Sequence, residues 1–276
     1  MSTLLRHWWS RLRGGNRIDP TLWSEVIESL VLLDGLDDDQ RTRLKQLGDR
    51  FLSRVAIEGA GGFEPNDEVR AEIAAQACLL VLELGLDWYR DLRSIVIYPG
   101  AFLSRYRVRD DAGVEHDLAE PRIGEAWDVG PVVLSFDDIA ASRQALSGVG
   151  NVIVHEMAHK LDGLNGVANG YPPLPAGMDR ERWTATFTEA FSELEAQVVA
   201  GRPPALDPYA LENPAEFFAV CSETFFVAPH RLAQGMPLVY EQLAAFYGQE
   251  PAKRRIPPSG RPTRHPGRRP PGPGFM

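Results

Sequence analysis

The stretch that decides the fold is VIVHEMAHKLD, residues 152–162. Its apolar residues recur at helical spacing, so we predict a helix over residues 150–163. On that helix His155 and His159 are four residues apart and lie on one face, about one turn from each other. Of the six histidines in the chain, these are the only two at this spacing. Two imidazoles placed in this way can share one tetrahedral zinc ion.

Glu156 directly follows the first of these histidines and points toward the same cleft. A carboxylate there can take a proton from water acidified by the metal and pass it to a leaving amine. This is the HExxH pattern of metallopeptidases, although three fixed letters in five positions also arise by chance. The apolar approach at 152–154 and the uncharged Met157 and Ala158 are typical of a buried active-site helix. We therefore predict one Zn²⁺ per chain with Glu156 as general base; the alternative is a helix with two exposed histidines.

A catalytic zinc usually has three protein ligands, and two later helices offer the third. The predicted helix over 180–200 is polar, and its acids could simply face solvent: Glu189, Glu193 and Glu195. Residues 213–223 (NPAEFFAVCSE) are almost entirely apolar, yet they contain Glu216 and Glu223 on one face. An unpaired carboxylate on a buried helix is costly, so a metal ion there would stabilise it. We predict Glu216 as the third ligand, and Glu223 as its supporting neighbour or as the alternative ligand.

Several separated motifs carry a resemblance to a known family. HEMAHKLD followed by NPAEFFAVCSETFF resembles the Mlc titration factor A family of bacterial cytosolic zinc peptidases, and is more distantly similar to the catalytic domain of anthrax lethal factor. The resemblance covers most of residues 20–248, including IAAQACLLVLELG (73–85), IVIYPGAF (95–102) and GEAWDVGPVVLSFDD (124–138). It implies zinc ligands His155, His159 and Glu216, general base Glu156, and an aminopeptidase-like activity on peptide substrates.

The resemblance and the residues suggest three further roles. Tyr209 lies seven residues before Glu216, the spacing at which lethal factor has a tyrosine beside its zinc. The resemblance implies that Tyr209 is catalytic and stabilises the developing oxyanion; otherwise it is a turn tyrosine after a proline. We expect Asp162 to orient a ligand histidine or to fix the next turn. Residues 124–127 are a candidate edge strand for an extended substrate, or an internal strand of the core.

The order of the predicted elements indicates the fold class. Two helices are expected within residues 19–57, the first over 20–33, and a third over 66–84. Short strands are expected at 94–98, 102–109, 114–118, 122–127 and 131–135, and helices at 137–147, 150–163, 180–200, 212–228 and 230–247. Helices, then clustered strands, then helices indicate an α+β fold. We predict a zincin-like metallopeptidase domain, mostly helical, with a small mixed sheet and an N-terminal helical part to about residue 90.

Charge is unevenly distributed along the 276 residues. The 29 basic and 38 acidic side chains give a net charge of −9, but residues 251–276 hold seven basic residues and no acid. Residues 1–250 therefore carry −16, which argues against direct nucleic-acid binding. The last 26 residues include eight prolines and four glycines, so we predict a disordered basic tail. The predicted organisation is an N-terminal arm (1–18), a peptidase domain (19–250) and this tail.

Localisation and partners follow from other features. The chain has no apolar run long enough to span a membrane and no secretory signal, and Cys78 and Cys221 lie in apolar helical stretches. We predict a cytoplasmic protein. We expect the arm with Trp8 and Trp9 to pack on the domain or to form an amphipathic helix that contacts a membrane or a partner.

The second hypothesis for function is a binding protein. The resembled family is named for a member that binds and inactivates a glucose-responsive transcriptional repressor, so such a repressor is a possible partner here. Exposed aromatic residues of the N-terminal arm would favour such an interface. The two functions are compatible, and the complete set of catalytic residue types favours the peptidase. The acidic excess near the cleft would also suit a substrate with a free amino group.

Overall fold

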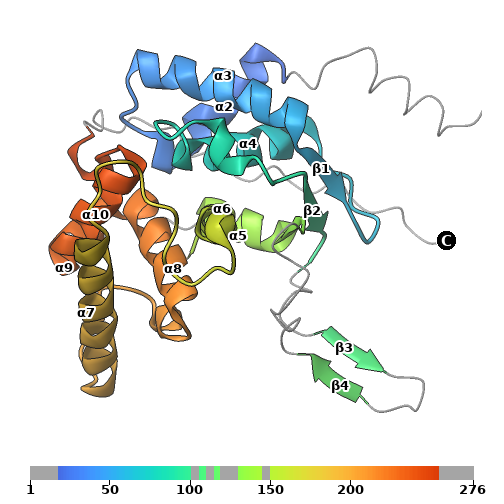
Figure 1. Ribbon diagram of the computed structural model, residues 1–276. Helices are drawn as coiled ribbons and strands as arrows, with labels where there is room; N and C mark the ends of the chain where they lie inside the picture. The colour runs from blue at the N-terminus through green and yellow to red at the C-terminus, as the bar shows by residue number, and fades with distance from the viewer. Residues whose placement is uncertain (1–17, 101–105, 110–114, 119–129, 145–149, 255–276) are drawn as a thin grey trace, which may run out of the picture.

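The computed structural model describes residues 18–100, 106–109, 115–118, 130–144 and 150–254 (Figure 1). These residues form a mostly helical molecule around a small parallel sheet, consistent with the predicted α+β class. The N-terminal arm, the candidate edge strand at 124–127 and the tail from residue 255 lie outside the described residues. In the described ranges, every helix is too short or too polar to cross a membrane.

Three helices form the N-terminal part: α2 (Pro20–Ser29), α3 (Asp38–Arg54) and α4 (Asp67–Leu80). Helix α3 starts with a capping box, in which the Asp37 carboxylate accepts from the Gln40 amide at 2.8 Å and the Gln40 side chain accepts from the Asp37 amide. Trp23 of α2 packs directly against Gly48 of α3, where a Cβ atom would lie 2.4 Å from the indole ring. The first predicted helix is shorter than expected, because it ends at Ser29 and a 3₁₀ turn, η1 (Val31–Leu33), follows.

The sheet has three parallel strands in the order β1-β2-β5: β1 (Ala56–Gly59), β2 (Ser94–Tyr98) and β5 (Val132–Ser135). Ile57 pairs with Ile95, and Ile97 pairs with Leu134; all four are buried in the core. Strands β3 (Tyr106–Arg109) and β4 (Glu115–Leu118) form a separate antiparallel pair. The prediction of one mixed sheet was therefore wrong for the described strands, because antiparallel pairing is confined to this second sheet.

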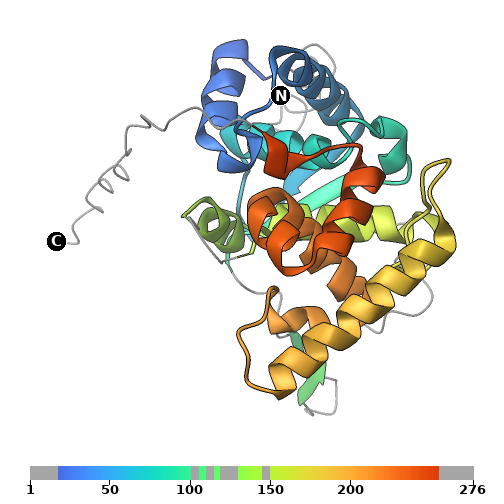
Figure 2. The ribbon, with the colours of Figure 1, turned by 90° about the vertical axis from the view of Figure 1, so that its left-hand side faces the viewer.

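The C-terminal half is helical, with α5 (Phe136–Gln144), α6 (Val152–Asp162), α7 (Arg180–Val199), α8 (Pro214–Val227), α9 (Pro229–Gly235) and α10 (Pro237–Tyr247). The single helix predicted over 230–247 is two helices. Pro237 lacks the amide that would continue α9, and Met236 before it leaves the helical region (φ −141°, ψ 68°). Helix α7 crosses one side of the molecule (Figure 2). Aromatic rings join α7 to its neighbours: the Trp183 ring lies 5.6 Å from the Phe246 ring of α10 and 6.1 Å from the Phe218 ring of α8.

Helix α6 lies between the N-terminal helices and the C-terminal helices and contacts α4 and α8 (Figure 1). Its buried face includes Ile153, Val154, Met157 and Ala158. This packing leaves His155, Glu156 and His159 only partly covered. The fold therefore fixes one face of α6 in the core and presents the opposite face to α8.

Candidate metal centre

A polar network holds the start of α6. Asn151 caps the helix, because its side-chain oxygen accepts from the Val154 amide at 3.0 Å. Its amide nitrogen donates to Gln76 of α4 at 2.6 Å. Gln76 in turn contacts Glu72, which pairs with Arg143 of α5. This network, buried at Asn151, Gln76 and Glu72, ties the helix that contains both histidines to two neighbouring helices, and the sequence analysis did not predict it.

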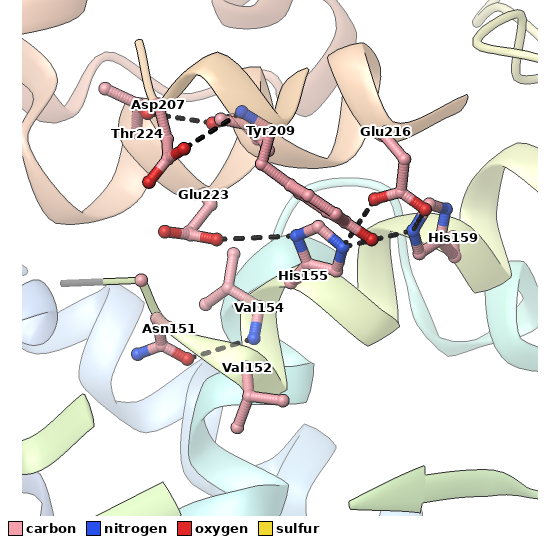
Figure 3. Close-up of polar contacts among 12 residues, drawn as sticks. Asn151, Val152, Val154, His155, His159, Asp207, Tyr209, Glu216, Glu223 and Thr224 are labelled. Atoms are coloured by element: carbon pink, nitrogen blue, oxygen red, sulfur yellow. Dashed lines mark hydrogen bonds and ion pairs between the residues drawn. The ribbon is translucent and has the colours of Figure 1, made fainter. Parts of the chain in front are cut away.

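Three predicted ligands come together between α6 and α8. Ligand atoms of His155, His159 and Glu216 lie within 4.8 Å of one another. The two histidine Nε2 atoms are 3.2 Å apart. One Glu216 oxygen is 3.0 Å from Nε2 of His155, and the other is 3.4 Å from Nε2 of His159. Figure 3 shows the three side chains facing one another.

These distances fit a tetrahedral cation. Ligands about 2.1 Å from such an ion stand about 3.4 Å apart, close to all three observed separations. Two imidazole nitrogens facing one carboxylate are also a donor set that zinc takes. Each of the three side chains is about 14–21% exposed, so solvent retains access to one side of the cluster. The three residues therefore fit a metal ion that keeps one coordination position open to solvent.

The charges of the cluster support one another in the metal-free protein. Burial raises the pKa of Glu216, but hydrogen bonds to His155 and His159 outweigh it and hold this pKa at about 2. Burial lowers the pKa of His155, but hydrogen bonds to Glu216 and Glu223 raise it to about 10. The cluster therefore has an ionised carboxylate, that of Glu216, and beside it a positively charged imidazole, that of His155.

Glu223 lies on the other side of His155. Its Oε2 atom is 3.4 Å from Nδ1 of His155, whereas the Glu216 carboxylate faces Nε2 (Figure 3). Gly150, just before α6, leaves room for this carboxylate: a Cβ atom there would lie 2.9 Å from the Glu223 Oε1 atom. This geometry supports the interpretation of Glu223 as a supporting neighbour over its interpretation as the third ligand.

Glu156 lies next to the cluster on α6 and is partly buried. Burial raises its pKa, and the charge of Glu216 raises it further, while His159 and His155 lower it. The carboxylates weighed as alternatives, Glu189, Glu193 and Glu195, are all exposed on α7. They lie outside the cluster, which agrees with the expectation that they face solvent.

Tyr209 reaches the cluster from η5 (Pro208–Leu211). The Asp207 carboxylate caps this turn by accepting from the Tyr209 amide at 2.9 Å. The Tyr209 ring lies 6.2 Å from the His155 ring, with its hydroxyl on the side of Glu216 (Figure 3). Burial and the nearby charge of Glu216 raise the pKa of Tyr209 to about 12, so its phenol stays protonated and can donate a hydrogen bond.

A cavity of about 330 Å³ adjoins the cluster and is bordered by His155 and Tyr209. Small apolar residues of α6 and α8, such as Val152 and Val220, form part of its wall. Apart from His155, its charged lining comprises three acids and one base: Asp138, Asp207, Glu223 and Arg231. The candidate centre therefore opens beside a space with more acidic than basic groups.

The cluster is a candidate metal centre between two helices, and comparison with known proteins places the chain in a family of metallopeptidases. Residues 5–248 match the family described as glucose-regulated metallo-peptidase M90, so the chain belongs to this family. The family implies a metal ion, and His155, His159 and Glu216 could hold it.

Several relatives have the name Mlc titration factor A, and two of them illustrate the match. The chain is 37% identical to that of Cronobacter sakazakii over 237 residues, 85% of this chain and 88% of the relative. It is 37% identical to that of Escherichia coli O9:H4 over 235 residues, 84% and 87% of the two chains. An uncharacterised protein of Synechocystis sp. is 36% identical over 249 residues, 89% and 90%. The predicted resemblance to the Mlc titration factor A family is confirmed.

Proposed function

We propose that the protein is a zinc-dependent, aminopeptidase-like metallopeptidase of zincin-like fold. The observation that carries this proposal is the convergence of His155, His159 and Glu216 at the separations that a tetrahedral ion requires. A general base directly follows the first ligand on the same helix. Membership of a metallopeptidase family supports the same reaction class. We further propose that the protein acts in the cytoplasm.

Each residue has a separate task in this scheme. A bound Zn²⁺ supplies Lewis acidity that polarises a carbonyl and makes water nucleophilic near neutral pH. Glu156 accepts the proton of the attacking water and delivers it to the leaving amine. Tyr209 donates its phenolic hydrogen to the oxyanion that develops on the carbonyl. Glu223 accepts from Nδ1–H of His155 and so fixes the orientation and tautomer of that ring.

The adjoining cavity supports a preference for substrates with a free amino group. Apart from the proposed ligand His155, its wall has three acids, Asp138, Asp207 and Glu223, and one base, Arg231. An ammonium group in this space would gain from their charges, particularly at low ionic strength. Acetylation of the substrate amine should therefore raise KM, and equal hydrolysis of free and blocked peptides would contradict the preference.

The proposed reaction is tested by combining metal analysis with peptide hydrolysis. We expect about one zinc per purified chain, loss of zinc in His155→Ala, and retained zinc in Glu156→Gln. Removing the general base should lower kcat by at least about 100-fold. Glu189→Gln, on the exposed face of α7, is the matched control and should keep wild-type activity. Full activity of Glu156→Gln with zinc bound would show that another group is the base.

A second candidate function is binding of a transcriptional repressor. It rests on the name of two relatives, Mlc titration factor A, which describes them as titrating Mlc. Pull-down of purified Mlc by wild type and by His155→Ala distinguishes the two functions. Binding that persists without the metal, alongside lost hydrolysis, would mean that one protein performs both tasks by different surfaces. A wild-type protein that hydrolyses peptides and leaves Mlc in solution would exclude the binding function.

A further inference from the structure

Asp162, the last residue of α6, has a buried carboxylate that the proposed reaction does not use. The residue is fully buried, and its Oδ2 atom accepts from the Gly170 amide at 2.7 Å. Its Oδ1 atom has no hydrogen-bond partner among the described residues. Burying a carboxylate is costly, so the bond to Gly170 is the main local compensation. The end of α6 is thus fastened to a loop eight residues further along the chain.

That loop is internally braced. The Asn165 side chain donates to the Tyr171 carbonyl at 2.9 Å, and the Tyr171 amide donates to the Asn169 side chain at 3.0 Å. These bonds hold the two ends of the loop at a fixed separation, so a shift at one end would move the other.

Gly170 rests directly on the first turn of α8. Its φ of +78° lies in the left-handed region, and a Cβ atom there would stand 2.3 Å from the Pro214 carbonyl oxygen. Pro214 is the first residue of α8, and Glu216 follows two residues later. The amide of Glu216 is itself held by the Asn213 cap at 3.0 Å. The contact therefore reaches the turn that presents the third ligand.

We propose that Asp162 and Gly170 are positioning residues of the metal centre. They fasten the end of α6, which supplies two histidines, to the start of α8, which supplies Glu216. Ligands of a metal centre must be held within about 0.5 Å of their working positions. Glu216 lies on a different helix from the histidines, so a link between the two helices sets its distance from them. This inference rests on the metal centre proposed above.

The test uses three substitutions in the full-length protein. Asp162→Leu removes both acceptor oxygens and keeps the branched shape of the side chain, Asp162→Asn keeps one oxygen, and Gly170→Ala places a methyl group against Pro214. We expect zinc affinity, measured by competition with a chelator, to fall about 10- to 100-fold in Asp162→Leu and Gly170→Ala. Asp162→Asn should show a smaller loss. Replacing a buried charge with an apolar residue can even raise stability, so we expect Asp162→Leu to stay folded.

A second readout needs no metal. Hydrogen exchange of the Glu216 amide in chelator-treated protein reports on the first turn of α8, and should be about 10-fold faster in both disruptive variants. The control is Gln249→Met, which removes two hydrogen bonds of a buried side chain far from Glu216 in the sequence, one to the Leu79 carbonyl and one from Arg254. It should change neither zinc affinity nor Glu216 exchange.

The outcomes separate this inference from the proposed function. Wild-type affinity and exchange in Asp162→Leu and Gly170→Ala would overturn it, as would equal losses in Gln249→Met. If the wild type binds zinc but cleaves no peptide, the proposed function fails and the affinity measurements still decide this inference. If the wild type binds no zinc, the metal centre fails, and the role of Asp162 as its positioning residue fails with it.

Discussion

His155 has different partners at its two ring nitrogens. Nε2 faces Glu216 and His159, and Nδ1 faces Glu223 at 3.4 Å. When Nδ1 carries the proton and donates it to Glu223, Nε2 keeps its lone pair on the side of the cluster. The Glu223 carboxylate cannot then join the other ligand atoms, because the His155 ring lies between Glu223 and Glu216. The positions of the two acids around one ring therefore distinguish the proposed ligand, Glu216, from its helper.

Asp162 gives the metal-free protein a recognisable pH dependence of stability. Burial raises its pKa from the usual 3.8 to about 6, although the Gly170 amide and the charge of His159 lower it. Between these values the folded protein holds the proton and the unfolded chain does not. The contribution of Asp162 to the free energy of unfolding is therefore fully present below about pH 4 and is lost as pH rises to about 6. The loss is limited to about 3 kcal/mol.

The measurement is urea unfolding of wild type and Asp162→Asn in chelator from pH 4 to pH 7. The asparagine does not titrate, so the other groups largely cancel in the difference between the two proteins. We expect the free energy of unfolding of the wild type to fall relative to the variant as pH rises. A difference that stays constant over this range would show that the Asp162 pKa is not raised.

At the scale of single elements, the cap of α6 is unusual because it is shared. Asn151 satisfies the Val154 amide and also donates to Gln76, whose neighbour Glu72 pairs with Arg143. An ordinary cap, such as Asn66 on α4, is exposed and satisfies a single amide, that of Val69 at 2.9 Å. Loss of Asn151 therefore breaks a connection between helices as well as a helix end.

We predict that Asn151→Ala lowers the free energy of unfolding by about 2–4 kcal/mol, because it removes a cap and leaves the buried Gln76 oxygen without its donor. The matched Asn66→Ala should cost about 1 kcal/mol. Zinc affinity should fall only in Asn151→Ala, since that helix contains two ligands. Denaturant unfolding and chelator competition on both variants check this, and equal costs at the two caps would contradict a shared role.

Helices with strong local signals could be predicted from the sequence. Apolar periodicity indicated α6 and α8, and the apolar surroundings of Glu216 singled it out among several carboxylates. Strand β1 was missed because only Ile57 of its four residues is buried, so it has no alternation to detect. The boundary between α9 and α10 was missed because the apolar pattern continues across Pro237.

Contacts between distant residues could not be predicted in the same way. Glu72 and Arg143 are 71 residues apart, and each has the appearance of an ordinary helix-surface charge in the sequence. The contact of Gly170 with Pro214 depends on the path of the loop, which no local pattern specifies. The kinds of residue in the candidate metal centre could thus be predicted from the sequence, whereas the contacts that hold them in place required the three-dimensional fold.

At the scale of the whole molecule, residues 249–254 join the C-terminal helices to the N-terminal part of the fold. The Gln249 side chain donates to the Leu79 carbonyl at 2.8 Å and accepts from Arg254 at the same distance. Arg254 also donates to the Leu32 carbonyl at 3.0 Å. With η6 (Pro251–Lys253) between them, these two residues fasten the C-terminal helices to α4 and to η1. The predicted tail thus starts too early at residue 251, because its first four residues belong to this clasp.

We predict that the clasp ends the part of the chain needed for stability. A chain ending at residue 254 should melt within about 2 °C of the full chain, whereas one ending at residue 248 should melt several degrees lower. Arg254→Met should cost about 1–3 kcal/mol, or roughly 3–10 °C in Tm, because it leaves two acceptors without their donor. Lys253→Met is the control, since Lys253 is exposed and pairs only with the neighbouring Glu250 within the described residues. If the chain ending at residue 254 melts as low as the one ending at 248, the residues beyond 254, rather than the clasp, hold the two ends together.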